Sequence, residues 1–117
     1  MKHNQKYQWH KVAENVGEIK FLDNDMAEIG VANKTFCIAL HNNILTACNQ
    51  KCPHAGGKLS QGFFDTVGNI VCPLHHYKFS LQSGRNTSGE GYYLKTLPIE
   101  IREEGVFIGV EENNLLN

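Results

Sequence analysis

The sequence predicts an all-β domain made of short antiparallel strands. Runs of β-branched and aromatic residues recur along the chain, and clusters of Asn, Asp and Gly separate them at the spacing of turns. Only residues 12–18 carry a helical pattern, and it is weak. The chain has 117 residues, which suits one domain and is short for two, so we expect residues 1–117 to form a single domain.

The first half of the chain is expected to contain a meander. Strands are predicted at residues 7–12, 19–22, 26–32, 35–41 and 44–48. Trp9 is expected to anchor the core from the first strand. Asn33-Lys34 and Asn42-Asn43 have the length and composition of tight hairpin turns, so the last three strands should pair consecutively.

The second half of the chain contains two loops rich in turn formers, at about 49–62 and 72–79. Strands are predicted at residues 70–71, 92–97, 99–103 and 106–111. Glu104-Gly105 is expected to be the last hairpin turn. The architecture that follows is a small antiparallel β-sandwich or barrel that holds the two loops face to face.

Composition and charge narrow the class of protein. The formal net charge of −1 favours neither nucleic acid nor an anionic membrane as a partner. The polar N-terminus lacks a secretory signal, and no stretch approaches the roughly 18 apolar residues of a membrane span, so a cytoplasmic protein is expected. In that reducing compartment the four cysteines indicate metal binding or catalysis rather than disulfides.

The candidate ligands lie in the two loops, as Cys52-Pro53-His54 and Cys72-Pro73-Leu74-His75. Each loop offers one thiol and one imidazole, and this ligand set suits zinc or an iron–sulfur centre. Structural zinc usually takes its ligands as C-x₂₋₄-C and H-x₃₋₅-H pairs, whereas Cys and His are mixed here. The mixture favours a binuclear iron cluster, with both cysteines on one iron and both histidines on the other.

This C-x-H…C-x-x-H pattern resembles the signature of Rieske-type [2Fe-2S] proteins, with matches at Cys52, His54, Cys72 and His75. The resemblance implies that these four side chains hold one [2Fe-2S] cluster and that the protein is an electron carrier rather than an enzyme. It implies a Rieske ferredoxin that passes electrons from a flavin reductase to a terminal oxygenase, as a monomer or in a transient complex.

Two other functions are compatible with the sequence. The first is a permanent subunit of a reductase, similar to the small subunit of assimilatory nitrite reductase. The second is a zinc-binding interaction module without a redox role. Co-purification with a large subunit would favour the first, and a colourless protein that holds zinc would favour the second.

Four positions depart from the pattern of respiratory Rieske proteins. Gly57 and Leu74 stand where those proteins have two cysteines that bridge the loops, so no such disulfide is expected. Tyr77 replaces a Ser near a bridging sulfide, and Phe79 replaces a Tyr that donates to a ligand sulfur. Fewer donors to sulfur lower the reduction potential, which we expect nearer about −150 mV than +300 mV.

Several neighbours of the loops are expected to matter less. His76, which takes the place of a Gly in relatives, is expected at an exposed rim. The segment 86–92 lacks the Pro of a covering loop, so that Tyr92 or Tyr93 would have to cover the cluster. Near the loops lie three lysines that could steer an acidic partner, although a solvated rim is the simpler interpretation: Lys51, Lys58 and Lys78.

Overall fold

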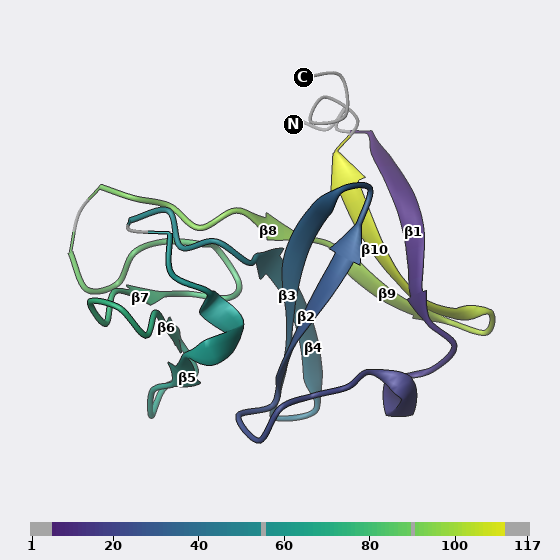
Figure 1. Ribbon diagram of the computed structural model, residues 1–117, viewed down its shortest axis with the longest axis horizontal. Coiled ribbons are helices and arrows are strands. Elements are labelled where there is room, and N and C mark those ends of the chain that lie inside the picture. Colours follow the sequence, from purple (N-terminus) through teal and green to yellow (C-terminus); the bar gives the residue numbers. More distant parts are fainter. Residues whose placement is uncertain (1–5, 55, 90, 112–117) are drawn as a thin grey trace.

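The computed structural model describes residues 6–54, 56–89 and 91–111, and it confirms the all-β class (Figure 1). Three antiparallel sheets have the strand orders β1-β10-β9, β2-β3-β4-β8 and β5-β6-β7. The elements are β1 (Tyr7–Ala13), η1 (Val16–Glu18), β2 (Met26–Val31), β3 (Lys34–His41), β4 (Ile44–Asn49), η2 (Leu59–Gln61), β5 (Phe63–Phe64), β6 (Ile70–Val71), β7 (Lys78–Phe79), β8 (Thr96–Leu97), β9 (Ile99–Arg102) and β10 (Gly105–Glu111), where η marks a 3₁₀ helix.

Two parts of the molecule are distinct in Figure 1. The base consists of the two larger sheets, residues 6–49 and 96–111, and it includes the pairing of β1 with β10. The lobe comprises the described residues between 50 and 95, and it contains β5, β6 and β7. No helix among the described residues has the length and apolar character needed to cross a membrane.

Strand β3 supplies side chains to two hydrophobic cores, because successive side chains of a strand point to opposite faces. Phe36 and Ile38 belong to the core of the base, which also contains Val106 and Ile108 of β10. Cys37 and Ala39 belong to the core of the lobe. Both faces of the central sheet are therefore covered, and β3 is buried continuously from Phe36 to Ala39.

Tight turns join the strands of the meander. Asn42 and Asn43 have φ of 53° and 64°, the left-handed pair of a type I′ turn, as the sequence predicts. The preceding turn lies at Ala32 and Asn33 (φ 51° and 65°), so the prediction of Asn33-Lys34 was wrong by one residue. Lys34 instead opens β3 and pairs with Val31, which places the left-handed Asn second in the turn.

The predicted strand at residues 19–22 is absent. The backbone of this segment turns on itself, since Phe21 N–H donates to Ile19 O and Asp25 N–H to Leu22 O. Ile19 nevertheless reaches the core of the base as a buried side chain. An apolar segment that docks by its side chains alone gives the same local pattern as a strand.

The other differences concern ends of elements. The strand predicted at 92–97 is only Thr96–Leu97, and the last turn lies at Glu103–Glu104, so Gly105 is the first residue of β10. Trp9 is half-buried rather than a core anchor, and its ring lies 5.0 Å from the Arg102 guanidinium, which covers it from the surface.

Candidate metal centre

The two ligand-bearing loops share one backbone design. Loop 1 (residues 50–62) joins β4 to β5, and loop 2 (residues 72–77) joins β6 to β7. Loop 2 ends earlier than predicted because Lys78 and Phe79 pair with β6. In each loop the cysteine N–H donates to the carbonyl five residues later, and its carbonyl accepts the N–H four residues later. These bonds join Cys52 to Gly57 (2.8 Å) and Gly56 (2.9 Å), and Cys72 to Tyr77 (2.9 Å) and His76 (3.1 Å).

The residue four positions after each cysteine has a left-handed backbone. Gly56 has φ of 77°, and His76, at the equivalent place in loop 2, has φ of 59°. Glycine adopts this conformation without steric cost, whereas a side chain makes it unfavourable. His76 is exposed, as the sequence predicts, and its ring centroid lies 5.8 Å from that of Phe63.

The two cysteine side chains meet inside the lobe. Cys52 and Cys72 are 2% and 0% exposed and belong to the same buried cluster. Burial raises the pKa of the Cys72 thiol, and the neighbouring Cys52 thiol raises it further, whereas the N–H groups of Leu74 and His75 donate toward the sulfur and oppose the shift. All four cysteines of the chain are free thiols.

The two imidazoles meet at the end of the lobe. The ring centroids of His54 and His75 lie 5.1 Å apart, with an angle of 72° between the rings. His75 is exposed and His54 is half-buried. The buried Nδ1 atom of His54 has no hydrogen-bond partner among the described residues, a costly state that a metal bond at this nitrogen would relieve.

Two tyrosines pack around His54. The ring of Tyr77 stacks on the imidazole with centroids 3.8 Å apart, and Tyr92 meets the same imidazole edge-on at 5.3 Å. Tyr92 therefore contacts this side of His54, although it is itself 46% exposed, and Tyr93 is 67% exposed. Ala55 and Glu90 lie outside the described residues. The stacking role of Tyr77 was not predicted, because it depends on loop 2 crossing over loop 1.

Polar contacts brace loop 1 internally and also attach it to the base. The Gln50 side chain donates to Ser60 Oγ (2.7 Å) and accepts from Ser60 N (3.1 Å), both buried. The Asn24 amide donates to the carbonyls of Ser60 and Gly62. Sequence reasoning missed these residues, because no motif marks a polar side chain that meets a distant backbone. Gly62 is required sterically, since a Cβ there would lie 1.9 Å from Val71 O.

The two departures at Gly57 and Leu74 face each other across the loops. A Cβ built on Gly57 would lie 3.0 Å from Leu74 Cγ and 3.0 Å from Cys72 Sγ. Phe79, the third departure, is fully buried in the core of the lobe and has no hydroxyl to donate. The side chains near the thiols are thus mostly apolar, and apart from the thiol of Cys52, itself a candidate ligand, the described donors toward Cys72 Sγ are the backbone N–H groups of Leu74 and His75.

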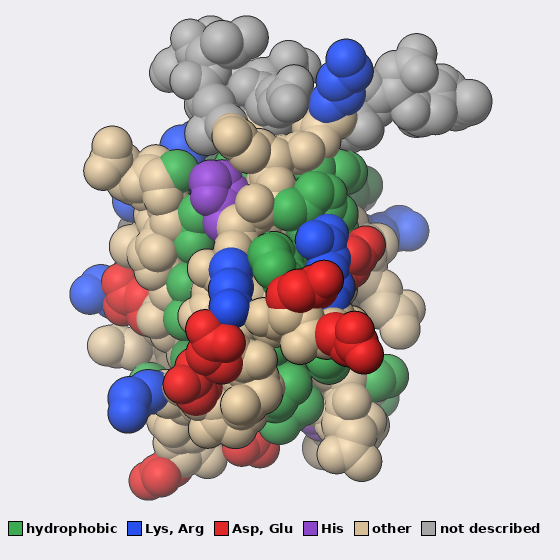
Figure 2. Space-filling view, turned by 90° about the vertical axis from the view of Figure 1, so that its right-hand side faces the viewer, with side chains coloured by type: hydrophobic (Ala, Val, Ile, Leu, Met, Phe, Trp, Pro, Cys, Tyr) green, Lys and Arg blue, Asp and Glu red, His purple; other side chains and the backbone are tan. Residues whose placement is uncertain are grey.

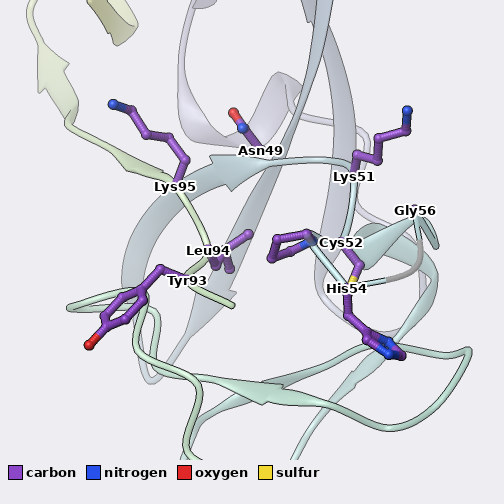
Figure 3. A pocket seen from close by; sticks show the side chains of 9 residues that line it. Asn49, Lys51, Cys52, His54, Gly56, Tyr93, Leu94 and Lys95 are labelled. Atoms are coloured by element: carbon purple, nitrogen blue, oxygen red, sulfur yellow. The ribbon is translucent and has the colours of Figure 1, made fainter. Parts of the chain in front are cut away.

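A hollow lies beside loop 1. Its lining residues are Asn49, Lys51, Cys52, Pro53, His54, Gly56, Tyr93, Leu94 and Lys95. In Figure 3 the Lys51 and Lys95 side chains extend to one side of the loop, and the His54 imidazole extends to the other.

Two loops on an antiparallel β scaffold, each with one buried thiol and one imidazole near the surface, are the arrangement expected of a protein that holds a metal centre. A family comparison gives the particular class. The model of the Rieske [2Fe-2S] domain matches residues 8–97, and the chain belongs to this family. The family binds a [2Fe-2S] cluster, so the alternative of a zinc-binding interaction module is set aside.

Curated relatives and solved structures agree with this family. The ferredoxin component of the alkene monooxygenase system of Xanthobacter autotrophicus is 25% identical over 76% of this chain and 73% of its own length. Further relatives match over slightly less than two thirds of their length. The ferredoxin of carbazole 1,9a-dioxygenase from Nocardioides aromaticivorans superposes with a TM-score of 0.72 at 18% identity, covering 88% of this chain and 97% of that one.

A second solved structure has the same fold. A putative nitrite reductase NADPH small subunit superposes with a TM-score of 0.73 at 17% identity, over 86% of this chain and 97% of that one. At these identities the superpositions establish a shared fold, and the electron partners have to be argued from the residues.

Proposed function

We propose that Cys52, His54, Cys72 and His75 hold one [2Fe-2S] cluster and that the protein carries single electrons between other proteins rather than acting as an enzyme. The observation that carries this proposal is the pairing of the four side chains. Two buried thiols contact each other, two imidazoles lie 5.1 Å apart, and two loops with the same backbone hydrogen bonds each supply one thiol and one imidazole. The unpartnered Nδ1 of His54 fits a bond to iron.

The chain's own residues divide the work of such a carrier. When bound, the cluster supplies reversible one-electron chemistry. The buried thiols of Cys52 and Cys72 attach it to the core of the lobe, where water is excluded. The exposed imidazole of His75 offers a short path to a docked partner, whereas Tyr77 and Tyr92 cover His54. Electrons therefore leave chiefly at His75.

The oxygenase ferredoxins among the relatives support the choice of partners. We propose a flavin reductase as donor and a terminal oxygenase as acceptor, met by a cytoplasmic monomer in brief complexes. One relative is a ferredoxin component of a monooxygenase system, and one structural neighbour is a complex of oxygenase and ferredoxin. The pairing of β1 with β10 supports a single domain over residues 1–117.

The test is an optical and EPR spectrum of the dithionite-reduced protein, with iron and sulfide analysis. The wild type should contain two irons and two sulfides per chain, as a [2Fe-2S] cluster requires, and give a Rieske-type signal. His75→Ala should lose the signal, whereas the neighbouring variant His76→Ala should retain it. Zinc in place of iron, or loss of the signal in the His76 variant alone, would overturn the proposal.

A permanent subunit of a reductase is the second candidate, and one observation favours it. Large apolar side chains are exposed near the imidazoles: Phe63 (46%), Leu74 (53%) and Tyr92 (46%). A permanent interface would bury them. Purification of the native protein, followed by analytical ultracentrifugation, separates the two candidates, because a stable large subunit would remain bound and a free ferredoxin would sediment alone.

A further inference from the structure

The charge of this protein is distributed unevenly along the molecule. Residues 50–95 contain five lysines and arginines against two acidic residues, whereas the rest of the chain has six against ten. Figure 2 shows the side of the molecule that carries β1, β9 and β10, where carboxylates gather over the middle and lower part with basic side chains among them. The net charge of −1 is therefore the sum of a lobe with net positive charge and a remainder of the chain with net negative charge.

Three of the five basic side chains of the lobe gather near one surface, together with Lys34 of the base. Two adjoining hollows share Asn49, Lys51 and Lys95, and the second hollow extends to Lys34. Lys51 lies opposite Lys58 in an isolated antiparallel bridge at the neck of loop 1. We call this surface the lysine flank, and its members are Lys34, Lys51, Lys58 and Lys95. The first hollow also reaches Cys52 and His54, so the flank adjoins the metal centre.

Most of this charge is not neutralised within the described residues. Lys95 pairs with Glu111, but no described carboxylate pairs with the other three members of the flank. Directly opposed like charges destabilise a strand pair, so the Lys51–Lys58 bridge is unfavourable within the molecule. An external anionic surface would relieve it.

The carboxylate of Asp65, the described acidic group of the lobe, does not neutralise the lysine flank. It accepts hydrogen bonds from the N–H groups of Val67 (3.0 Å) and Asn69 (2.9 Å), which hold it in the turn between β5 and β6. Its nearest basic group is Lys78, 4.0 Å away and outside the flank. The lysine flank, which joins three lysines of the lobe to Lys34 of the base, is therefore only partly neutralised by the described residues and lies beside the metal centre.

We infer that the lysine flank docks an acidic surface segment of a redox partner protein and orients the partner beside loop 1. The positive charge of the flank is independent of function, whereas the identity of its occupant rests on the electron-carrier function proposed above. Steering by local charge accelerates encounter and weakens as salt rises. The acidic base would repel the same partner, so the molecule would present its lobe first.

Oxidation kinetics of the reduced holoprotein test the sign of the local charge. The protein loses one electron and hexacyanoferrate(III) gains it. Attraction to the flank should make the rate constant fall at least about threefold as ionic strength rises from 0.01 to 0.15 M, because the Debye length shrinks from about 30 to 8 Å. Net charge alone predicts a rise, since protein and oxidant are both anionic.

Matched variants locate the effect. Lys51→Gln/Lys58→Gln should slow the oxidation at low salt by about threefold and flatten its salt dependence. Lys11→Gln/Lys20→Gln removes the same charge from exposed positions of the base and should leave both unchanged. Lys34→Gln/Lys58→Gln avoids the residue next to Cys52 and should resemble the first variant. Equal effects of flank and base variants, with unchanged optical spectra, would overturn the inference.

A second measurement detects binding rather than electron transfer, so failure of the proposed function remains distinguishable. Amide chemical shifts of ¹⁵N-labelled protein are followed as poly-L-glutamate is added. Shifts should gather at residues 33–36, 49–51, 57–58 and 95, and poly-L-lysine should not cause them. No shifts, shifts elsewhere, or larger shifts with a single-stranded oligonucleotide of equal charge would each contradict an acidic protein segment as the occupant.

Discussion

The phenol ring of Tyr77 lies parallel to the imidazole of His54, with an angle of 10° between the rings and their centroids 3.8 Å apart. Loop 2 thus fixes the orientation of a candidate ligand that belongs to loop 1. Tyr92 completes the contact from the segment after β7, with its ring centroid 6.2 Å from that of Tyr77. The geometry of the centre therefore depends on three separate segments.

Removal of this stack should loosen the centre. Aromatic pairs contribute about 0.5–1.5 kcal/mol beyond the area they bury, so Tyr77→Ala should release iron to a chelator about three- to tenfold faster than the wild type. Tyr77→Phe keeps the ring and should release iron at the wild-type rate. Equally fast release from both variants, above the wild-type rate, would show that the hydroxyl rather than the ring matters, and wild-type rates in both would show that the stack does not hold the centre.

The reduction potential should be low. Phe79 is buried without a hydroxyl, and the donors found at Cys72 Sγ are backbone N–H groups, so the reduced state receives few side-chain hydrogen bonds. A redox titration should give a value nearer about −150 mV than +300 mV, and Phe79→Tyr should raise it by tens of millivolts.

The control for this substitution is Phe36→Tyr, which adds the same hydroxyl to the buried core of the base. It should leave the potential unchanged. A wild-type potential above about +100 mV would contradict the argument from missing donors.

His76 should be replaceable by glycine with a gain in stability. A side chain in the left-handed region costs about 1–2 kcal/mol, and the extra freedom of glycine in the unfolded chain offsets up to about 1 kcal/mol. In urea denaturation His76→Gly should exceed His76→Ala by about 0.5–1 kcal/mol in unfolding free energy. Gly56→Ala should lower the free energy of unfolding by a similar amount, because loop 1 has the same left-handed backbone at this position.

Stability should decline in acid partly through Asp65. Desolvation acts to raise the pKa of Asp65, but hydrogen bonds from Asn69 and Val67 and the charge of Lys78 lower it overall. The ionised carboxylate therefore stabilises the fold above its ordinary pKa of about 3.9, and the contribution is lost as pH falls through the lower folded value. Asp65→Asn should flatten this decline in denaturation measured from pH 5 downward.

The exposed variant Asp23→Asn serves as the comparison, because Asp23 accepts no side-chain hydrogen bond from the described residues. Its pH dependence should follow the wild type. If the decline in acid persisted in the Asp65 variant, the turn between β5 and β6 would not be its source.

The sequence predicted the features that depend on local chemistry. The spacing of Cys52, His54, Cys72 and His75 identified the two loops, and Asn42-Asn43 fixed a turn, because both signals lie in a few consecutive residues. The strand predicted at 19–22 failed because docking by side chains and pairing by backbone give the same apolar pattern.

Contacts between distant segments could not be predicted in the same way. The stacking of Tyr77, the choice between Tyr92 and Tyr93 as the ring that contacts His54, and the apposition of Lys51 and Lys58 all depend on how the loops lie in space. The net charge of −1 likewise gave no sign of the lysine flank, because a total charge does not say where on the surface the charged side chains lie.

Strand β3 carries one further consequence, for the order in which the protein matures. It shares backbone hydrogen bonds with β2 and β4, but its side chains divide between the two cores. The base can therefore close around Phe36 and Ile38 before iron arrives, with Cys37 and Ala39 already placed as the floor of the unfinished lobe. In the apoprotein, amide hydrogen exchange would be slow at β3 and β10 and fast at β5–β7. Cluster insertion would then be the last folding step, and it would take place after the base has reached its native structure.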